Sequence, residues 1–194
     1  AGTPVDMMAR LVARSAATHL GQPVVIDNRS VASGVPAAAA VARAEPDGYT
    51  LLLATAVQVT MPPAISRSSS LDPRELAAVA YLADMPMVLI VSAASTIGTL
   101  SDFVDLPTLA EAGLAGAEVV AWIGVMAPAG LPRVVSRTLE RAFVEAVLSP
   151  ELRERLRPFG VDPVGQGGRA LAATVEADAA LWRRVAAATG ITVD

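Results

Sequence analysis

Residues 20–55 read LGQPVVIDNRSVASGVPAAAAVARAEPDGYTLLLAT and indicate the fold class of the whole chain. The valines and isoleucine of 23–27 predict a short strand, and the alanine-rich stretch 35–43 predicts a helix that ends before a Pro-Asp-Gly turn. Residues 50–54 end in four successive apolar side chains, typical of a strand buried on both faces. This strand–helix–strand pattern predicts a βαβ unit, and open α/β sheets bind small molecules at the carboxyl ends of their strands.

The rest of the chain continues the alternation of strands and helices. We expect a first helix that begins near Val5 or Asp6 and ends at Gly21, and a capped single turn that begins at Asp72. The other expected elements are strands over 77–83, 87–92 and 119–126, a capping box at 108–111, and helices that begin at 132, 149 and 169. Together they predict an α/β fold with a mixed, mostly parallel sheet flanked by helices on both faces.

Composition excludes several classes of function. With 19 acidic and 15 basic residues the net charge is −4, which argues against a nucleic-acid partner. The chain has no cysteine and one histidine, so thiolate and His-rich metal sites are excluded, and we expect no metal and no cofactor. A Ser-His-Asp triad would need His19, which falls at the expected end of a helix. Asp27, Asn28 and Arg29 resemble a catalytic acid with its orienter, but no partner base is recognisable.

The chain is apolar without a membrane-spanning pattern. Its mean hydropathy is +0.50, yet no apolar run approaches the roughly 18 residues that a membrane helix needs. No signal-peptide pattern stands at Ala1, and the sequence leaves open whether such a segment was removed. We therefore expect no direct membrane insertion.

Short pieces of the sequence, taken in order, resemble one receptor family. They are GTPVDMMAR at 2–10, LGQPVVIDNR at 20–29, PDGYTLLLAT at 46–55, LDPREL at 71–76, LPTLAEAGL at 106–114, AWIGVMAPAGLP at 121–132 and SPELRERLRPFG at 149–160, followed by VDPVG and a Trp-bearing helix. Each piece alone is weak, but their shared order resembles the Bug or TctC-like substrate-binding proteins of tripartite tricarboxylate transporters.

This resemblance implies the type of fold and its function. Such proteins are periplasmic, have two lobes of the type II-like periplasmic-binding-protein kind, and close like a Venus flytrap around a small carboxylate. They perform no chemistry and deliver the ligand to the permease subunits in the membrane. We expect the same partners and location for this chain.

The chain departs from that family in two places. The family's first strand, an apolar segment before the glycine loop, is absent ahead of Ala1. IGTLSDF at 97–103 passes directly into VDLPTLAEAG at 104–113, where relatives place a stretch of domain size. We therefore expect 1–103 and 104–194 to form lobe 1 together, with the second lobe missing at the 103/104 junction. A natural deletion, a decayed gene and an omission of residues from the sequence would each explain the missing lobe. Loss of the first strand as well would expose a central edge of the sheet.

Two loops are the candidate ligand-binding site, because helix N-termini offer backbone N–H groups to an anion. The first comprises Gly2, Thr3, Pro4, Val5 and Asp6. The second comprises Thr55, Ala56, Val57 and Gln58, which bring a hydroxyl and an amide. An ordinary capped loop and an ordinary strand exit are the structural alternatives, and the resemblance implies that the lobe-one ligand contacts lie in both loops. Since like charges repel, we expect Asp6 to cap its helix or to pair with a ligand amino group.

Trp122 stands in the Trp-aromatic-Gly position of the family, here Trp-Ile-Gly, near the crossing between lobes. Core or hinge packing is favoured over ligand stacking for so large a side chain. Two functions remain open beside carboxylate capture. One is a truncated lobe that acts as a non-binding interaction or dimerisation module, and the other is a hydrolase, which lacks a G-x-S-x-G motif.

Overall fold

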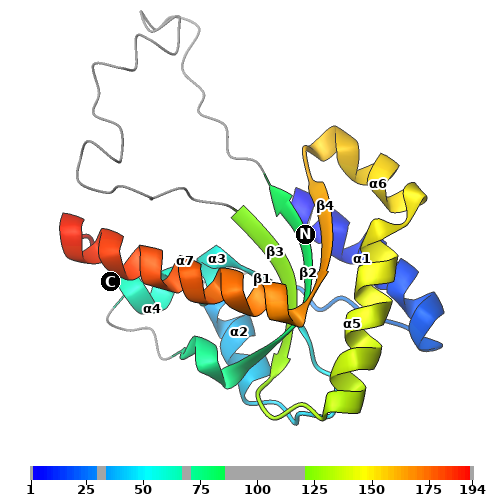
Figure 1. Cartoon of the computed structure of the whole chain (residues 1–194), viewed down its shortest axis with the longest axis horizontal. Helices are drawn as coiled ribbons and strands as arrows, with labels where there is room; N and C mark the ends of the chain where they lie inside the picture. Colours follow the sequence, from blue (N-terminus) through cyan, green and yellow to red (C-terminus); the bar gives the residue numbers. More distant parts are fainter. Residues whose placement is uncertain (1, 30–33, 67–70, 86–120, 193–194) are drawn as a thin grey trace, which may run out of the picture.

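The computed structural model describes residues 2–29, 34–66, 71–85 and 121–192. Its centre is a four-stranded sheet in the order β1-β3-β2-β4 (Figure 1). The strands are β1 (Leu52–Thr55), β2 (Leu76–Met85), β3 (Ala121–Pro128) and β4 (Asp162–Gly167). The α/β class is confirmed, but the prediction of a mostly parallel sheet is wrong. Every pairing is antiparallel, because β3 enters between β1 and β2 and runs opposite to both.

The predicted strand over 23–27 is also wrong, because no neighbouring strand pairs with it in the described structure. Residues 22–29 carry neither helix nor strand, and Val25 is 84% exposed. Two cavities, of about 820 and 660 Å³, are each lined by residues 25–26 and by residues 51–53, the last two of which belong to β1. β1 is an edge of the sheet, so its outer backbone groups have no strand partner among the described residues. A strand needs such a partner for its N–H and C=O groups.

One face of the sheet packs against α1 (Pro4–Leu20), α5 (Arg133–Leu148) and α6 (Pro150–Leu156). On β3 the side chains of Ile123, Val125 and Ala127 point to this face, at the spacing of two that a strand imposes. The core there is built from apolar side chains of the sheet and of these helices, among them Met8, Val12, Val79, Leu82, Leu139, Phe143 and Val147.

The opposite face carries α2 (Val35–Ala42), α3 (Ala56–Val59) and α7 (Gly168–Thr189), with α4 (Met61–Ile65) packed on α7. Figure 1 shows α7 lying across the strands on this side. Trp122 and Met126 of β3 point here, and Gly124 lies between them. A Cβ at Gly124 would lie 2.6 Å from both methyl carbons of Leu171, so glycine lets α7 approach the sheet.

Local capping signals predicted the helix boundaries well. The N-cap of α1 is Thr3, and the helix ends at Gly21 in the left-handed conformation. The Asp72 side chain accepts the Arg74 N–H at 2.9 Å and begins η2 (Pro73–Glu75), as predicted. The Ser149 Oγ accepts the Leu152 N–H at 3.3 Å and begins α6, and η5 (Arg157–Phe159) then ends at Gly160.

Three elements were not predicted, namely α3, α4 and β4. The two helices are single turns, and β4 contains Pro163, Gly165 and Gly167, residue types that disfavour a strand. The predicted strand over 87–92 and the capping box at 108–111 lie outside the described residues, as does the 103/104 junction.

Candidate ligand-binding site

A cavity of about 820 Å³ brings together the N-terminal ends of two helices and one side chain of a third. Thr3, Val5 and Asp6 line it from the start of α1, Gly34 lines it from the start of α2, and Gln58 lines it from α3. The two predicted loops, about fifty residues apart in sequence, thus contribute to one cavity. The α2 contribution was not predicted.

The start of α1 offers few free donors, because the loop satisfies most of them itself. The Thr3 Oγ1 accepts the Asp6 N–H at 3.2 Å, and the Asp6 Oδ2 accepts the Gly2 N–H at 3.0 Å. Pro4, at the first helical position, has no N–H. Val5 remains, since an N–H at the second helical position has no acceptor within its own helix.

The carboxylate of Asp6 is fully engaged within the wall of the cavity. In addition to Gly2, its oxygens accept the Asn28 Nδ2 at 2.7 Å and the Arg10 Nε at 3.2 Å. The hydrogen bond from Asn28, followed by those from Gly2 and Arg10, holds the pKa of Asp6 well below its ordinary range. Asp6 therefore braces the start of α1, whose N-cap is Thr3 rather than Asp6, and its charge is balanced by Arg10.

Gln58 presents its amide group to the same cavity. Its Oε1 accepts the Thr55 N–H at 3.1 Å, which leaves the Nε2 as the donating end of the side chain, with no acceptor for it among the described residues. A Cβ at Gly34 would lie 2.5 Å from that Nε2, so the amide rests directly against the N-cap of α2. Gly34 itself has φ +83, a conformation that glycine adopts without strain.

The start of α2 adds donors that no described side chain caps. The N–H groups of Val35 and Ala37 lie in the first turn, where no acceptor exists within the helix. Arg29 lines the cavity as well and pairs with Asp27, its Nε donating to the Asp27 Oδ2 at 2.9 Å. The site thus combines helix N-termini, one amide donor and one guanidinium.

Several predicted site residues lie elsewhere. Gly2, Pro4, Thr55, Ala56 and Val57 do not line this cavity: Ala56 is buried in the core, and Val57 is half exposed. Asn28, Arg29 and Gly34 line the cavity but were not predicted as site residues. The Asp-Asn-Arg stretch at 27–29 was the available signal, because it stands at the end of the segment interpreted as a strand.

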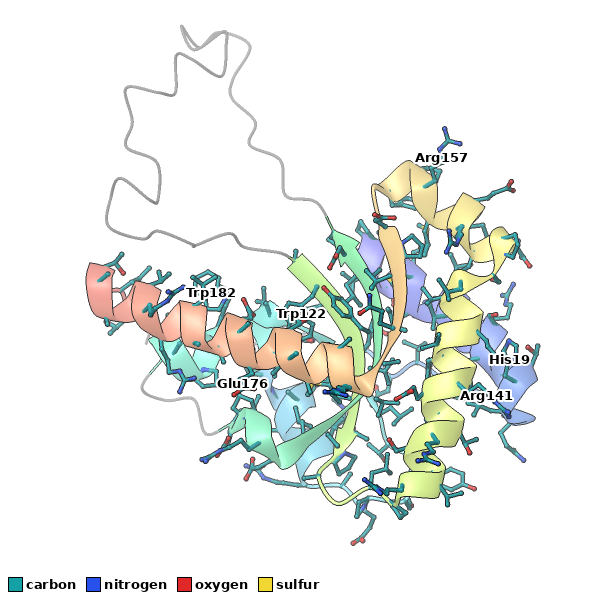
Figure 2. All side chains as sticks on the ribbon, in the orientation of Figure 1. His19, Trp122, Arg141, Arg157, Glu176 and Trp182 are labelled. Carbon is teal, nitrogen blue, oxygen red and sulfur yellow. The ribbon has the colours of Figure 1, made fainter. Side chains whose placement is uncertain are left out.

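Trp122 lies in the core rather than at the cavity. It is buried beneath α7, and its Nε1 donates to the Asp178 Oδ2 at 3.0 Å; Figure 2 shows it between β3 and α7. This position agrees with the packing role that we favoured over ligand stacking.

Other kinds of site receive no support from the described part of the chain. His19 lies at the end of α1, and its Nδ1 is 3.1 Å from the Glu145 Oε2 of α5. Within residues 2–29, 34–66, 71–85 and 121–192, no three His, Asp or Glu side chains gather as metal ligands would. In the same ranges no helix is both long and apolar enough to cross a membrane.

Comparison with known proteins identifies the family. The model of the tripartite tricarboxylate transporter family receptor, TctC, matches residues 8–106 and 101–191. A UPF0065 protein of Bordetella bronchiseptica is 39% identical over 105 residues, which cover 54% of this chain and 31% of the relative. The UPF0065 protein in the tcbD-tcbE intergenic region of Pseudomonas sp. is 24% identical over 275 residues, covering 95% of this chain and 82% of the relative.

Among solved structures, MatC from Rhodopseudomonas palustris, with bound malate, has the same fold. The TM-score is 0.81 at 23% identity, and the match covers 95% of each chain. The family model spans nearly the whole sequence, and it describes a solute receptor rather than an enzyme. This chain therefore belongs to the tripartite tricarboxylate transporter receptor family, TctC.

Proposed function

We propose that this chain captures a small carboxylate as one lobe of an extracytoplasmic receptor and serves its delivery to a transporter. One observation carries the proposal. The caps of α1 and α2 and the donating end of Gln58 meet at one cavity of about 820 Å³.

The charges of the cavity favour an anion. Helix N-termini carry partial positive charge and unpaired N–H groups, and both stabilise a carboxylate. The two acidic side chains of the lining, Asp6 and Asp27, are each paired with an arginine of their own. Gln58 Nε2 adds a neutral donor that fixes the orientation of a bound carboxylate.

The residues of the two predicted loops have three different roles in this proposal. Thr3, Val5 and Gln58 face the cavity and contact the carboxylate. Gly2, Pro4, Asp6 and Thr55 shape the loops around them, through the hydrogen bonds of Asp6 and of Gln58. Ala56 and Val57 form the first turn of α3 but do not line the cavity, so neither side chain contacts the ligand.

We further propose that 1–103 and 104–194 form lobe 1 and that a second lobe completes the site. The alignment with the Pseudomonas protein covers 275 positions, more than the 194 residues of this chain, so that relative has residues without a counterpart here. A single lobe supplies about half of the donors around a ligand enclosed between two lobes. Its affinity for a carboxylate is therefore much weaker than that of a two-lobed receptor.

Membership of the receptor family supports the periplasm as the location of this chain and the permease subunits of a tripartite transporter as its partners. MatC, with its bound malate, supports a dicarboxylate as the ligand class. Closure of two lobes around the ligand is the event that the permease recognises.

Calorimetric titration with malate tests the assignment of Gln58. The protein is a two-lobed version that carries the corresponding segment of MatC between Phe103 and Val104. Gln58→Leu keeps the approximate size of the side chain, removes both the Nε2 donor and the acceptor of the Thr55 N–H, and weakens binding at least tenfold. Val57→Ala, in the same turn but outside the cavity, is the matched control and leaves the Kd unchanged. Equal affinity of the Gln58→Leu and parent proteins would contradict the site.

A second function, an interaction module, is favoured by one observation. The apolar side chains of Val25, Tyr49 and Val134 are 84%, 87% and 78% exposed, and all three line the second cavity of about 660 Å³. Exposed apolar patches of this kind mark surfaces that bind a partner. Light scattering at several protein concentrations tests self-association through this patch, and a strict monomer would exclude it.

A further inference from the structure

Asp178 is a buried carboxylate that the proposed ligand site does not use. It lies on α7, its residue is 7% exposed, and no other charged residue of the described chain is as buried. Among the described residues no arginine or histidine forms an ion pair with it. Burial of a carboxylate without a counter-ion is unfavourable, and an apolar residue at such a site is often neutral or stabilising. Stability alone therefore does not account for Asp178.

One oxygen of Asp178 joins three separate elements. The Oδ2 accepts the Trp122 Nε1–H at 3.0 Å and is hydrogen-bonded to the Thr60 hydroxyl. Thr60 is buried and follows α3, where its Oγ1 also lies 3.1 Å from the Ala56 carbonyl oxygen. The carboxylate of α7 is thus bonded to β3 on one side and to the end of α3 on the other.

Each partner of Asp178 occupies a position that matters to the receptor. α3 carries Gln58, whose amide faces the ligand cavity. Trp122 is the second residue of β3 and pairs in register with Asp84, near the end of β2. β2 and β3 are the strands that lead into and out of 86–120 (Figure 1). The Tyr81 hydroxyl donates to Asp84 Oδ1 at 2.6 Å, a hydrogen bond within β2 near the end of that strand.

We propose that Asp178 is a positioning residue that fixes α3, and with it Gln58, relative to the ends of β2 and β3. The contact chain runs from Gln58 along two residues of the backbone to Thr60, the C-cap of α3, then through Asp178 Oδ2 to Trp122. A shift of the strand ends therefore changes the position of the ligand-facing amide, and the reverse holds as well. The role of this coupling in ligand capture rests on the proposed function, whereas the coupling itself is a property of the ligand-free chain.

The experiment compares amide and indole ¹H–¹⁵N spectra of the ligand-free chain in a Trp182→Phe background, where Trp122 is the remaining tryptophan. Asp178→Leu removes the shared acceptor, so the Trp122 indole signal and the amide signals of 56–59 both shift. Asp178→Asn retains an oxygen for the indole and adds an N–H for Thr60, so it preserves both sets of signals. Leu181→Ala, a buried position on the same helix, lowers the melting temperature without shifting either set.

Thr60→Val provides a second variant that keeps the volume and removes only the hydroxyl. It shifts the amides of 56–59 and leaves the indole signal near its original position, because the bond from Trp122 to Asp178 remains. The proposal is overturned if Thr60→Val and Asp178→Leu leave the α3 amides in place, or if Leu181→Ala shifts them equally. If Asp178→Leu does not fold, the α3 amide signals of Thr60→Val alone decide the outcome.

A malate titration of the two-lobed version separates this proposal from the proposed function. If malate does not bind the parent protein while the ligand-free shifts are observed, the proposed function fails and the coupling stands. If malate binds the parent and the Thr60→Val variant with equal Kd, the coupling does not reach the site. We expect Thr60→Val to bind malate several-fold more weakly than the parent protein. Leu181→Ala, which lowers the melting temperature, is the control for a loss of stability alone.

Discussion

The Asn28 Nδ2 donates a hydrogen bond of 2.7 Å to the Asp6 Oδ1 and joins two segments that lie 22 residues apart. Asn28 belongs to the irregular stretch at 22–29, and Asp6 lies in the first turn of α1. The bond closes one wall of the cavity of about 820 Å³, the candidate ligand-binding site, and fixes Asp6 where it accepts the Gly2 N–H. The geometry of the glycine loop therefore depends on a residue outside that loop.

Replacement of Asn28 by alanine raises the pKa of Asp6 toward its ordinary value. The Asn28 amide is the largest cause of the lowered pKa, and its loss leaves Gly2 and Arg10 as the remaining donors. Carboxyl ¹³C chemical shifts recorded through an acid titration measure this change. Arg29→Ala, a neighbour that pairs with Asp27 instead, leaves the Asp6 titration unaltered. An unchanged Asp6 titration in Asn28→Ala would show that the bond does not form in solution.

Stability falls with acid as two aspartates take up protons. Asp6 and Asp72 have lowered pKa values in the folded chain, that of Asp72 being about 2 because Arg74 donates to it through side chain and backbone. As the pH falls, the two aspartates therefore take up protons in the unfolded chain before they do so in the folded chain. Their contribution to the free energy of unfolding is present above about pH 4 and is lost as the pH falls through the folded pKa values. Urea unfolding at a series of pH values measures the slope, and Asp72→Asn makes it shallower. A slope identical in both proteins would exclude the Asp72–Arg74 interaction as its source.

Gly124 and Leu171 form a coupled pair across the sheet–helix interface. Gly124→Ala forces its Cβ against the Leu171 methyl groups and destabilises the fold by about 1–3 kcal/mol. Leu171→Ala alone leaves a cavity and costs about 2–5 kcal/mol. In the double variant the new methyl occupies part of that cavity, so the combined loss is smaller than the sum. Denaturant unfolding of the four proteins measures the coupling, and strict additivity would contradict the packing.

An apolar strand added ahead of Ala1 stabilises the chain. About five apolar residues placed there pair with the outer edge of β1, which has no strand partner among the described residues, and fill the space lined by residues 25–26 and 51–53. Residues 23–27 then become a strand, so their amide hydrogen exchange slows and the melting temperature rises. An extension of equal length with alternating glycine and proline cannot pair and is the control. Equal melting temperatures for both extensions would show that the space does not accept a strand.

Elements with local signals were predicted from the sequence almost to the residue. The proline at 132 and the apolar stripe after it predicted α5, and the last helix was predicted over 169–189 and found as Gly168–Thr189. These signals are caps and periodicities within a few residues of each other. The direction of the sheet has no such signal, because β3 reaches its place between β1 and β2 only after the chain has passed through 86–120.

The candidate site was predicted in part for the same reason. Thr3, Val5 and Gln58 follow from the rule that helix N-termini attract anions and from the resemblance. Gly34 and Asn28 were missed, since 27–29 was weighed only as a catalytic acid with its orienter and the helix predicted over 35–43 was given no part in the site. Thr60 and Asp178 are 118 residues apart, and only the folded chain brings their side chains together.

The central claim, that this chain is one lobe of a carboxylate receptor, is tested most directly by its thermal unfolding with and without malate. The 194-residue chain is compared with the version that carries the MatC segment between Phe103 and Val104, after circular dichroism has shown that both are folded. The two-lobed protein gains about 2.7 kcal/mol at a malate concentration about 100-fold above its Kd, and the single lobe shows little or no shift. Binding of malate by the single lobe with a millimolar or lower Kd, or a folded two-lobed protein that does not respond, would contradict the account.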